Sequence, residues 1–135
     1  MRDALIVSTA RTPLTKSYRG TFNNTTAPTM AGWAIEEAVK RSEVDPDKVD
    51  DVIMGAALQQ GTTHANVARN AALAAGLPVT VSGMSLDRQC SSGMMAIATA
   101  AKQIISDGMD VVVGGGLDSI SLVQTEKMNL DRYGD

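Results

Sequence analysis

Apolar and polar positions along the chain alternate between two kinds of pattern. Four short segments, most of them continuous apolar runs, are typical of strands buried on both faces of a sheet. The longer segments between them repeat apolar residues every three or four positions, which predicts helices. This βαβαβαβ order predicts an α/β fold, with a mostly parallel sheet flanked by helices. The predicted strands are residues 5–9, 52–57, 84–89 and 110–116, and the predicted helices are 30–41, 66–75 and 91–107.

Local signals place the ends of these elements. Thr29 is a candidate N-cap for the first helix. Gly76, with Pro78 beyond it, ends the second helix. Asp45 and Pro46 have the cap and first-position chemistry of a short helical turn. In the third helix, a stripe of apolar residues predicts a broad face buried against the sheet. The stripe consists of Met94, Ala98, Ala101 and Ile105.

Cys90, the one cysteine of the chain, stands where the third predicted strand turns into the third predicted helix. The first N–H groups of a helix are unpaired and carry partial positive charge, which favours a thiolate. Functional sites of parallel sheets gather at the carboxyl ends of strands, where His64 and the glycines 114–116 are also expected. A buried, inert Cys90 remains the alternative. Its place at the sheet edge supports a nucleophile instead.

Other candidate chemistry is less specific. His64 could act as a general base toward Cys90, but nothing in the sequence orients its ring, and a surface or interface histidine is favoured. Arg88 could stabilise a thiolate electrostatically or form a structural ion pair. The glycines 114–116 lack the spacing of a nucleotide-binding loop, so a close backbone approach is favoured there. One cysteine and one histidine cannot build a metal site, and none is expected.

Composition fits one soluble globular domain. The 135 residues are 44% hydrophobic and 20% charged, with a net charge of −3 at pH 7. No basic cluster is interleaved with aromatic residues, so we expect no nucleic-acid partner. The apolar residues 4–10 are too few for a signal sequence or a membrane span, so no membrane association is expected. A single cysteine suits a reducing compartment, which predicts a cytoplasmic protein.

Four motifs resemble, in the same order, those of the thiolase family, the acyl-CoA acetyltransferases. Residues 85–97, Ser-Leu-Asp-Arg-Gln-Cys-Ser-Ser-Gly-Met-Met-Ala-Ile, resemble the nucleophile motif. Residues 10–13 resemble the Ala-Arg-Thr-Pro signature, and residues 66–69 resemble the Asn-x-Ala-Arg helix start. Residues 115–121 resemble the Gly-Gly-Met-Glu-Ser-Met-Ser turn, with Asp118 in place of the family's usual glutamate. Together the motifs span nearly the whole chain.

The resemblance implies that Cys90 is the nucleophile. Cys90 would take the acyl group of a 3-ketoacyl-CoA or of acetyl-CoA as a thioester, and its backbone N–H would donate to the oxyanion. Coenzyme A is then a substrate, no cofactor is implied, and the motifs do not identify the residues that bind CoA. The family's catalytic histidine and second cysteine lie in a later half, so residues 1–135 alone are expected to be inactive. The residues of the nucleophile motif are closer to those of degradative thiolases than to those of biosynthetic thiolases.

The resemblance also implies an architecture. The strand order would be 3-2-1-4, with a fifth strand supplied by residues outside this sequence. Residues 1–121 would form an incomplete N-terminal α/β domain, and residues 122–135 would begin an inserted loop region. A homodimer or homotetramer is implied, with the edge strand before Cys90 and the helix after it facing the partner. The alternatives are a ketoacyl-synthase-type condensing enzyme, which uses acyl-carrier protein, and a non-catalytic truncated protein of this fold.

Overall fold

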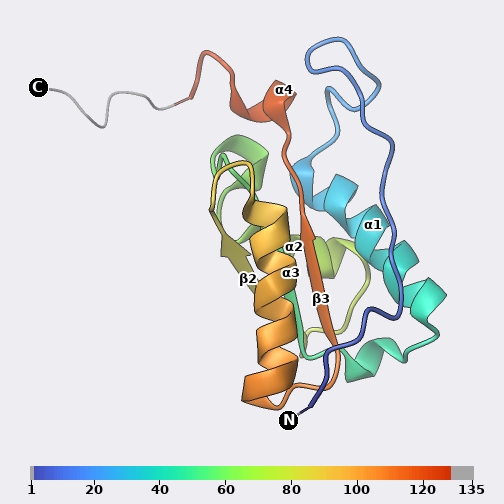
Figure 1. Cartoon of the computed structure of the whole chain (residues 1–135). Coiled ribbons are helices and arrows are strands. Elements are labelled where there is room, and N and C mark those ends of the chain that lie inside the picture. Colours follow the sequence, from blue (N-terminus) through green and yellow to red (C-terminus); the bar gives the residue numbers. More distant parts are fainter. Residues whose placement is uncertain (1, 129–135) are drawn as a thin grey trace, which may run out of the picture.

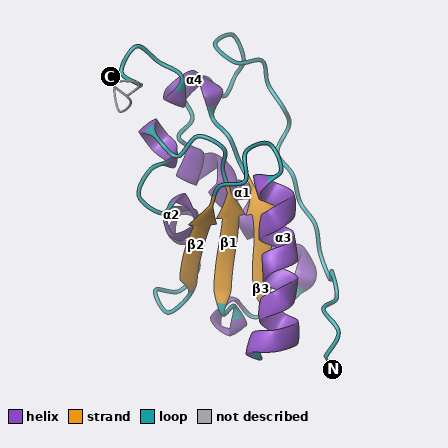
Figure 2. Cartoon of the chain, turned by 60° about the vertical axis from the view of Figure 1, so that its left-hand side comes forward, coloured by secondary structure: helices purple, strands orange, loops and turns teal. Residues whose placement is uncertain are grey.

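A three-stranded parallel sheet lies between two layers of helices (Figures 1 and 2). The computed structural model describes residues 2–128. Its main elements are α1 (Ala27–Ser42), β1 (Asp51–Gly55), α2 (Val67–Ala74), β2 (Ser82–Leu86), α3 (Ser92–Lys102), β3 (Val112–Gly116) and α4 (Ile120–Val123). Helix α3 covers one face of the sheet, and α1 and α2 cover the other. The predicted α/β class, with a parallel sheet flanked by helices, is confirmed.

The sheet has the order β2-β1-β3, so the predicted order 3-2-1-4 is wrong. Strand β1 pairs in parallel with β2, from Asp51 opposite Ser82 to Gly55 opposite Leu86. On its other side it pairs along the same length with β3. Strand β1 corresponds to the predicted second strand and β3 to the predicted fourth. Because these two strands pair directly, no other strand can lie between them.

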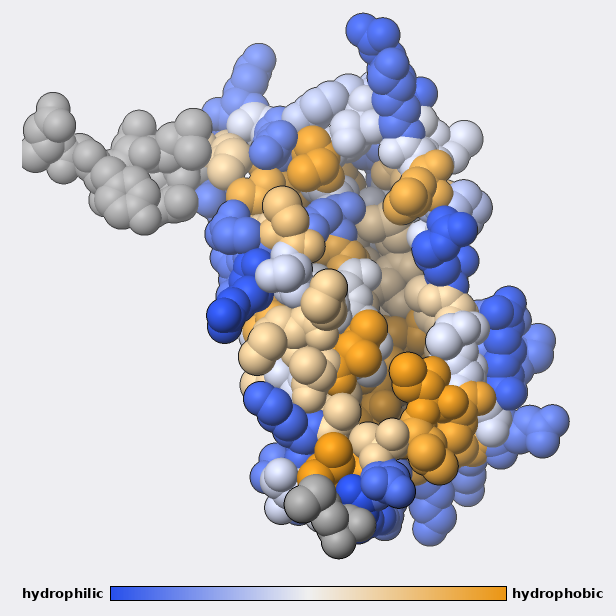
Figure 3. Space-filling model, viewed as in Figure 1, coloured by the Kyte–Doolittle hydropathy of each residue, from blue (hydrophilic) through white to orange (hydrophobic). Residues whose placement is uncertain are grey.

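Residues 5–9, predicted as the first strand, form no strand. They run beside α1, where Ser8 Oγ donates to the Ala38 carbonyl (2.6 Å) and Arg41 donates to the Thr9 carbonyl (3.0 Å). A strand requires a neighbouring backbone to complete its hydrogen bonds, and no described residue pairs with this backbone. The predicted fifth strand was assigned to residues outside this sequence, so it stays a prediction. Apolar surface gathers over this segment (Figure 3). The exposed side chains are Leu5, Ile6 and Val7.

The predicted helices are present, with changed ends. Helix α1 begins at Ala27, and Thr26 replaces Thr29 as the N-cap, because the first turn of a helix tolerates Pro28. Helix α3 continues into a π-helical turn, Gln103–Asp107. The strand before it ends at Leu86, earlier than the predicted end at residue 89.

Alternate residues of β1 pack into different layers, as expected for a strand buried on both faces. Val52 and Met54 pack in the cluster that includes residues of α1 and α2. Ile53 points the other way and packs against Ala96 and Ala100 of α3. All five residues of this strand are buried, which places the centre of the core at β1.

The predicted buried face of α3 is wrong. Met94 is 75% exposed and Ile105 is 39% exposed, whereas Ala96 is fully buried. The cause lies in the strand beneath: a Cβ atom on Gly114 would lie 2.9 Å from the Cα atom of Ile97. The helix backbone therefore lies so close to the sheet that small residues fill the contact, and the larger apolar side chains point outwards.

The division predicted at residue 121 stays a prediction. Helix α4 crosses that position, and Tyr18 N donates to Ser121 Oγ (2.8 Å), so this helix contacts the long loop that follows residue 14. Residues 129–135, half of the predicted second region, lie outside the described residues.

Candidate active site

Cys90 lies in a tight turn between β2 and α3, as predicted. Asp87 Oδ1 accepts a hydrogen bond from Gln89 N (2.7 Å), and Gln89 has a φ of 51°, in the left-handed region that side chains disfavour. Ser92 is 2% exposed and closes the turn: its Oγ accepts from Arg88 N (2.8 Å) and donates to the Gln89 carbonyl (2.6 Å). Strained turns held by several hydrogen bonds are common at functional sites.

The thiol and the N–H group of Cys90 are both available for contact. The side chain of Cys90 is exposed, so the alternative of a buried thiol does not hold. Within residues 2–128, no group accepts a hydrogen bond from the Cys90 N–H. This N–H stands just before the first turn of α3, where the helix dipole adds partial positive charge.

Close backbone contacts fix the start of α3 on the sheet. A Cβ atom on Gly55 would lie 2.2 Å from the carbonyl carbon of Ser92, and one on Gly116 would lie 2.7 Å from the Cα atom of Gly93. Glycine, which has no side chain, permits this approach. The glycines 114–116 belong to β3 itself rather than to a turn after it. Their predicted role, close approach to another element, is confirmed.

Asp118 joins the chain after β3 to the loop after β1. Its Oδ1 accepts a hydrogen bond from Ala57 N (3.0 Å). Partial burial of the carboxyl raises the pKa of Asp118 above its usual 3.8; hydrogen bonds from Ala57 and Leu58 oppose this, and the charge of Asp87 adds to it. Sequence reasoning missed this contact, because it depends on how two loops distant in sequence are placed.

The two other candidate side chains do not reach Cys90 by a hydrogen bond. His64 is exposed, just after the short helix Gly61–Thr63, which agrees with the surface interpretation. Strand β2 ends at Leu86, so strand alternation does not direct Arg88 toward the thiol. In the part of the chain that the structure describes, no ion pair includes Arg88.

The Asn-x-Ala-Arg motif positions the strand before the turn that holds Cys90. Asn66 caps α2 by accepting from Arg69 N (3.3 Å), and its Nδ2 donates to the Gly83 carbonyl of β2 (2.8 Å). The Arg69 guanidinium donates to the carbonyl oxygens of Val79 (2.9 Å) and Val81, on the approach to β2. The motif therefore has a structural role that its spacing alone did not indicate.

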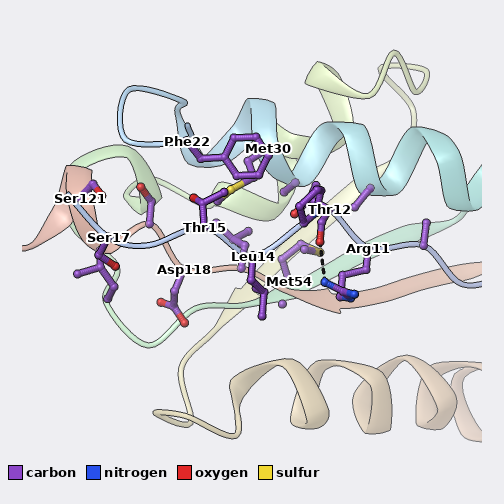
Figure 4. Close-up of a pocket in the computed structure, with 18 residues that line it drawn as sticks. Arg11, Thr12, Leu14, Thr15, Ser17, Phe22, Met30, Met54, Asp118 and Ser121 are labelled. Carbon is purple, nitrogen blue, oxygen red and sulfur yellow. Dashed lines mark hydrogen bonds between the residues drawn. The ribbon is translucent and has the colours of Figure 1, made fainter. Parts of the chain in front are cut away.

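A cavity of about 300 Å³ lies beside the site rather than at Cys90 (Figure 4). Two of the four motifs line it together, through residues 10–13 and 116–121, with Met30 and Met54 at its apolar wall. Cys90 is not among the lining residues. The thiol thus stands on an open turn, outside the cavity.

Residues 2–128 contain neither a metal-binding cluster nor a membrane-spanning helix. No group of three or more His, Cys, Asp or Glu residues is placed to hold a metal ion. No described helix is both long enough and apolar enough to span a bilayer.

Comparisons with known proteins agree on one family. The family model "Thiolase, N-terminal domain" matches residues 4–133. A 3-ketoacyl-CoA thiolase of Bacillus subtilis is 37% identical over 123 residues, which cover 91% of this chain and 32% of that protein. An acetyl-CoA acetyltransferase of Cupriavidus necator is 39% identical over 121 residues, covering 90% of this chain and 30% of that protein.

A solved structure is similar over the whole chain. The crystal structure of the Bacillus anthracis acetyl-CoA acetyltransferase has a TM-score of 0.88 and 42% identity to this chain, of which it covers 100%. The match takes up 34% of that crystallised chain. This chain therefore spans about a third of the length of the relatives that it matches.

Proposed function

The chain belongs to the thiolase family, whose N-terminal domain it matches, and we propose that Cys90 is the nucleophile of an acyl-CoA acyltransferase. The observation that carries the proposal is the exposed Cys90 with its unpaired N–H at the start of α3, within the segment that resembles the nucleophile motif. Because the relatives are about three times as long, the activity is proposed for the full-length protein.

The chemistry is the cleavage of a C–C bond that forms an acyl thioester on Cys90, followed by an exchange of thioesters. In the degradative direction, which the motif wording favours, the Cys90 thiolate attacks the C3 carbonyl of a 3-ketoacyl-CoA. The bond between C2 and C3 breaks, its electron pair leaves with the acetyl-CoA enolate, and a proton from an acid completes acetyl-CoA. A CoA thiolate then attacks the acyl-Cys90 thioester and expels the Cys90 thiolate. One thioester replaces another, so this exchange is readily reversible.

Residues of this chain supply the nucleophile and part of its electrostatics. The Cys90 N–H can donate to the oxyanion that forms when a carbonyl is attacked. A base must remove the thiol proton before the attack, and the family resemblance assigns that base to a histidine outside this chain. CoA serves as a substrate, and no cofactor is expected.

A brief incubation of the full-length protein with acetyl-CoA tests the proposal. We expect an acetyl group on Cys90, seen by mass spectrometry in the tryptic peptide 89–102 after an acid quench. The Cys90→Ser variant should carry none. Equal acetylation of this variant, or no acetylation of the wild type, would contradict the proposal. Transfer from acetyl-acyl-carrier protein but not from acetyl-CoA would favour the ketoacyl-synthase alternative.

We propose a second copy of the chain as the partner of the face formed by β2 and α3. Strand β2 is an edge of the described sheet, so one side of its backbone is open to pairing. Met84 on β2 and Met94 and Ile97 on α3 are exposed apolar side chains, 38%, 75% and 48% accessible. Exposed apolar surface of this kind is typical of protein interfaces.

A charge on this face should separate the subunits. Met94→Glu is expected to convert the full-length dimer or tetramer into smaller species, because the carboxylate would be buried without a partner. Light scattering after size exclusion measures the mass. Leu73→Glu is the matched control, since Leu73 is 45% exposed but lies on α2, across the sheet from α3. A monomeric wild type, or equal dissociation of both variants, would contradict the proposed interface.

We also propose the cytoplasm as the compartment. A thiol must be reduced to act as a nucleophile, and reducing compartments keep single cysteines in that form. Acyl-CoA substrates and a free Cys90 thiol would thus be available in one place. Cell fractionation of the native host, with detection of the full-length protein, is the direct measurement.

A further inference from the structure

Backbone contacts join the carboxyl ends of the three strands beneath the Cys90 turn. Leu117 N donates to the Gly55 carbonyl (3.0 Å), which connects the exit of β3 to the end of β1. Ala56 N donates to the Leu86 carbonyl (3.0 Å), which connects the exit of β1 to the end of β2. The nucleophile turn begins at the next residue. Its position is therefore set by a continuous row of contacts that starts after β3.

Asp118 adds a side chain to this row. Its Oδ1 accepts a hydrogen bond from Ala57 N (3.0 Å). In the loop after β1, Ala56 is therefore bonded to the end of β2, and the next residue is bonded to Asp118. Figure 4 shows Asp118 beside this loop, at the edge of the cavity. Asp87, whose carboxylate accepts from Gln89 N (2.7 Å), is near enough for its charge to raise the pKa of Asp118. Asp87 therefore holds the turn of Cys90 itself, and Asp118 holds the loop after β1 that is hydrogen-bonded to the end of β2.

We propose that Asp118 is a positioning residue for Cys90, which fixes the turn 87–91 by holding the exit of β1 to the exit of β3. The inference deepens the proposed function and rests on it. Loss of the acceptor oxygen would leave Ala57 N–H without its partner and free the loop to move. The contact is a hydrogen bond from the Ala57 N–H to Oδ1, so it needs an acceptor oxygen, which a neutral amide also supplies. A neutral asparagine can therefore fill the same role.

The test compares Asp118→Ala, Asp118→Asn and a matched control in the full-length protein. The control is Asp50→Ala: Asp50 Oδ2 also accepts from two backbone N–H groups, those of Asp110 (2.8 Å) and Val111 (3.1 Å), at the opposite end of the sheet. Two quantities are measured below the melting temperature. They are the hydrogen-exchange rate of amides 87–91 and the rate of Cys90 alkylation by iodoacetamide.

Asp118→Ala should speed exchange of amides 87–91 about tenfold and slow alkylation of Cys90 about threefold, since the thiol loses its fixed place at the helix start. Asp118→Asn should stay within about twofold of the wild type in both. Asp50→Ala should leave both unchanged while speeding exchange near residue 110.

Two results would overturn the role of Asp118. One is exchange at 87–91 no faster in Asp118→Ala than in Asp50→Ala, and the other is Asp118→Asn behaving like Asp118→Ala. A wild-type Cys90 that alkylates no faster than free cysteine would count against the proposed function instead. In that case the exchange rates still decide the role of Asp118, so the two failures are distinguishable.

Discussion

Cys90→Ser in the full-length protein should lower thiolysis of acetoacetyl-CoA at least about a thousandfold and leave folding unchanged. A serine hydroxyl is not ionised at neutral pH and is a far weaker nucleophile than a thiolate. Folding should be unaffected because the Cys90 side chain is exposed. Steady-state rates with acetoacetyl-CoA and CoA measure the effect, and thermal melting checks the fold.

The adjacent serine provides the control. Ser91 is exposed, and its Oγ donates to the Arg88 carbonyl (2.8 Å), a contact that holds the turn without offering a nucleophile. Ser91→Ala should therefore keep activity within about fivefold of the wild type. If Cys90→Ser kept more than about a tenth of the activity, or if Ser91→Ala lost as much, Cys90 would not be the residue that carries the acyl group.

The place of Cys90 could be predicted from the sequence because it depends on order alone. A strand followed by a helix in a parallel sheet puts the connecting turn at the carboxyl edge, wherever the other strands lie. The wrong strand order therefore did not disturb the predicted location. The interpretation of Cys90 as a nucleophile rests on the resemblance, since a strand-to-helix turn does not by itself distinguish a reactive thiol from an inert one.

The fate of residues 5–9 could not be predicted from their pattern. Their apolar, β-branched sequence resembles that of β1, which is buried on both faces. The pattern indicates that the segment is apolar and suited to an extended backbone, but it does not indicate which part of the chain lies beside the segment. Here α1 lies beside the segment and contacts it through the Ala38 carbonyl, which accepts from Ser8 Oγ, and through the Arg41 side chain, which donates to the Thr9 carbonyl. These contacts do not replace a neighbouring strand, so the segment forms none.

The side of α3 that faces the sheet was mispredicted for a related reason. Periodicity ranks Met94 and Ile105 as the strongest buried candidates, because they are the larger apolar residues. The glycines of the strands bring the helix so close that alanines fit where methionine does not. That distance is a property of two elements together, and so is the contact between Asp118 and Ala57. Neither can be read from one element's sequence.

Gly55→Ala should be the most disruptive single substitution at the carboxyl ends of the strands. The added methyl group would lie 2.2 Å from the carbonyl carbon and oxygen of Ser92 and 2.7 Å from Gly93 N. Strand β1 is buried and hydrogen-bonded on both sides, so the start of α3 must shift instead. We expect a loss of about 1–3 kcal/mol in the free energy of unfolding. Because Cys90 precedes this helix turn, acetylation by acetyl-CoA should also fall about tenfold or more.

Gly115→Ala separates this effect from the general cost of alanine in a glycine-rich strand. A Cβ atom at Gly115 would meet the Sδ (3.2 Å) and Cε (3.3 Å) atoms of Met54, the end of a flexible side chain that can move aside. The loss in the free energy of unfolding should stay below about 1 kcal/mol, and Cys90 should be acetylated at nearly the wild-type rate. Urea unfolding and the acetylation assay measure both variants. Equal losses in the two would show that the contact between Gly55 and Ser92 does not hold the nucleophile turn in place.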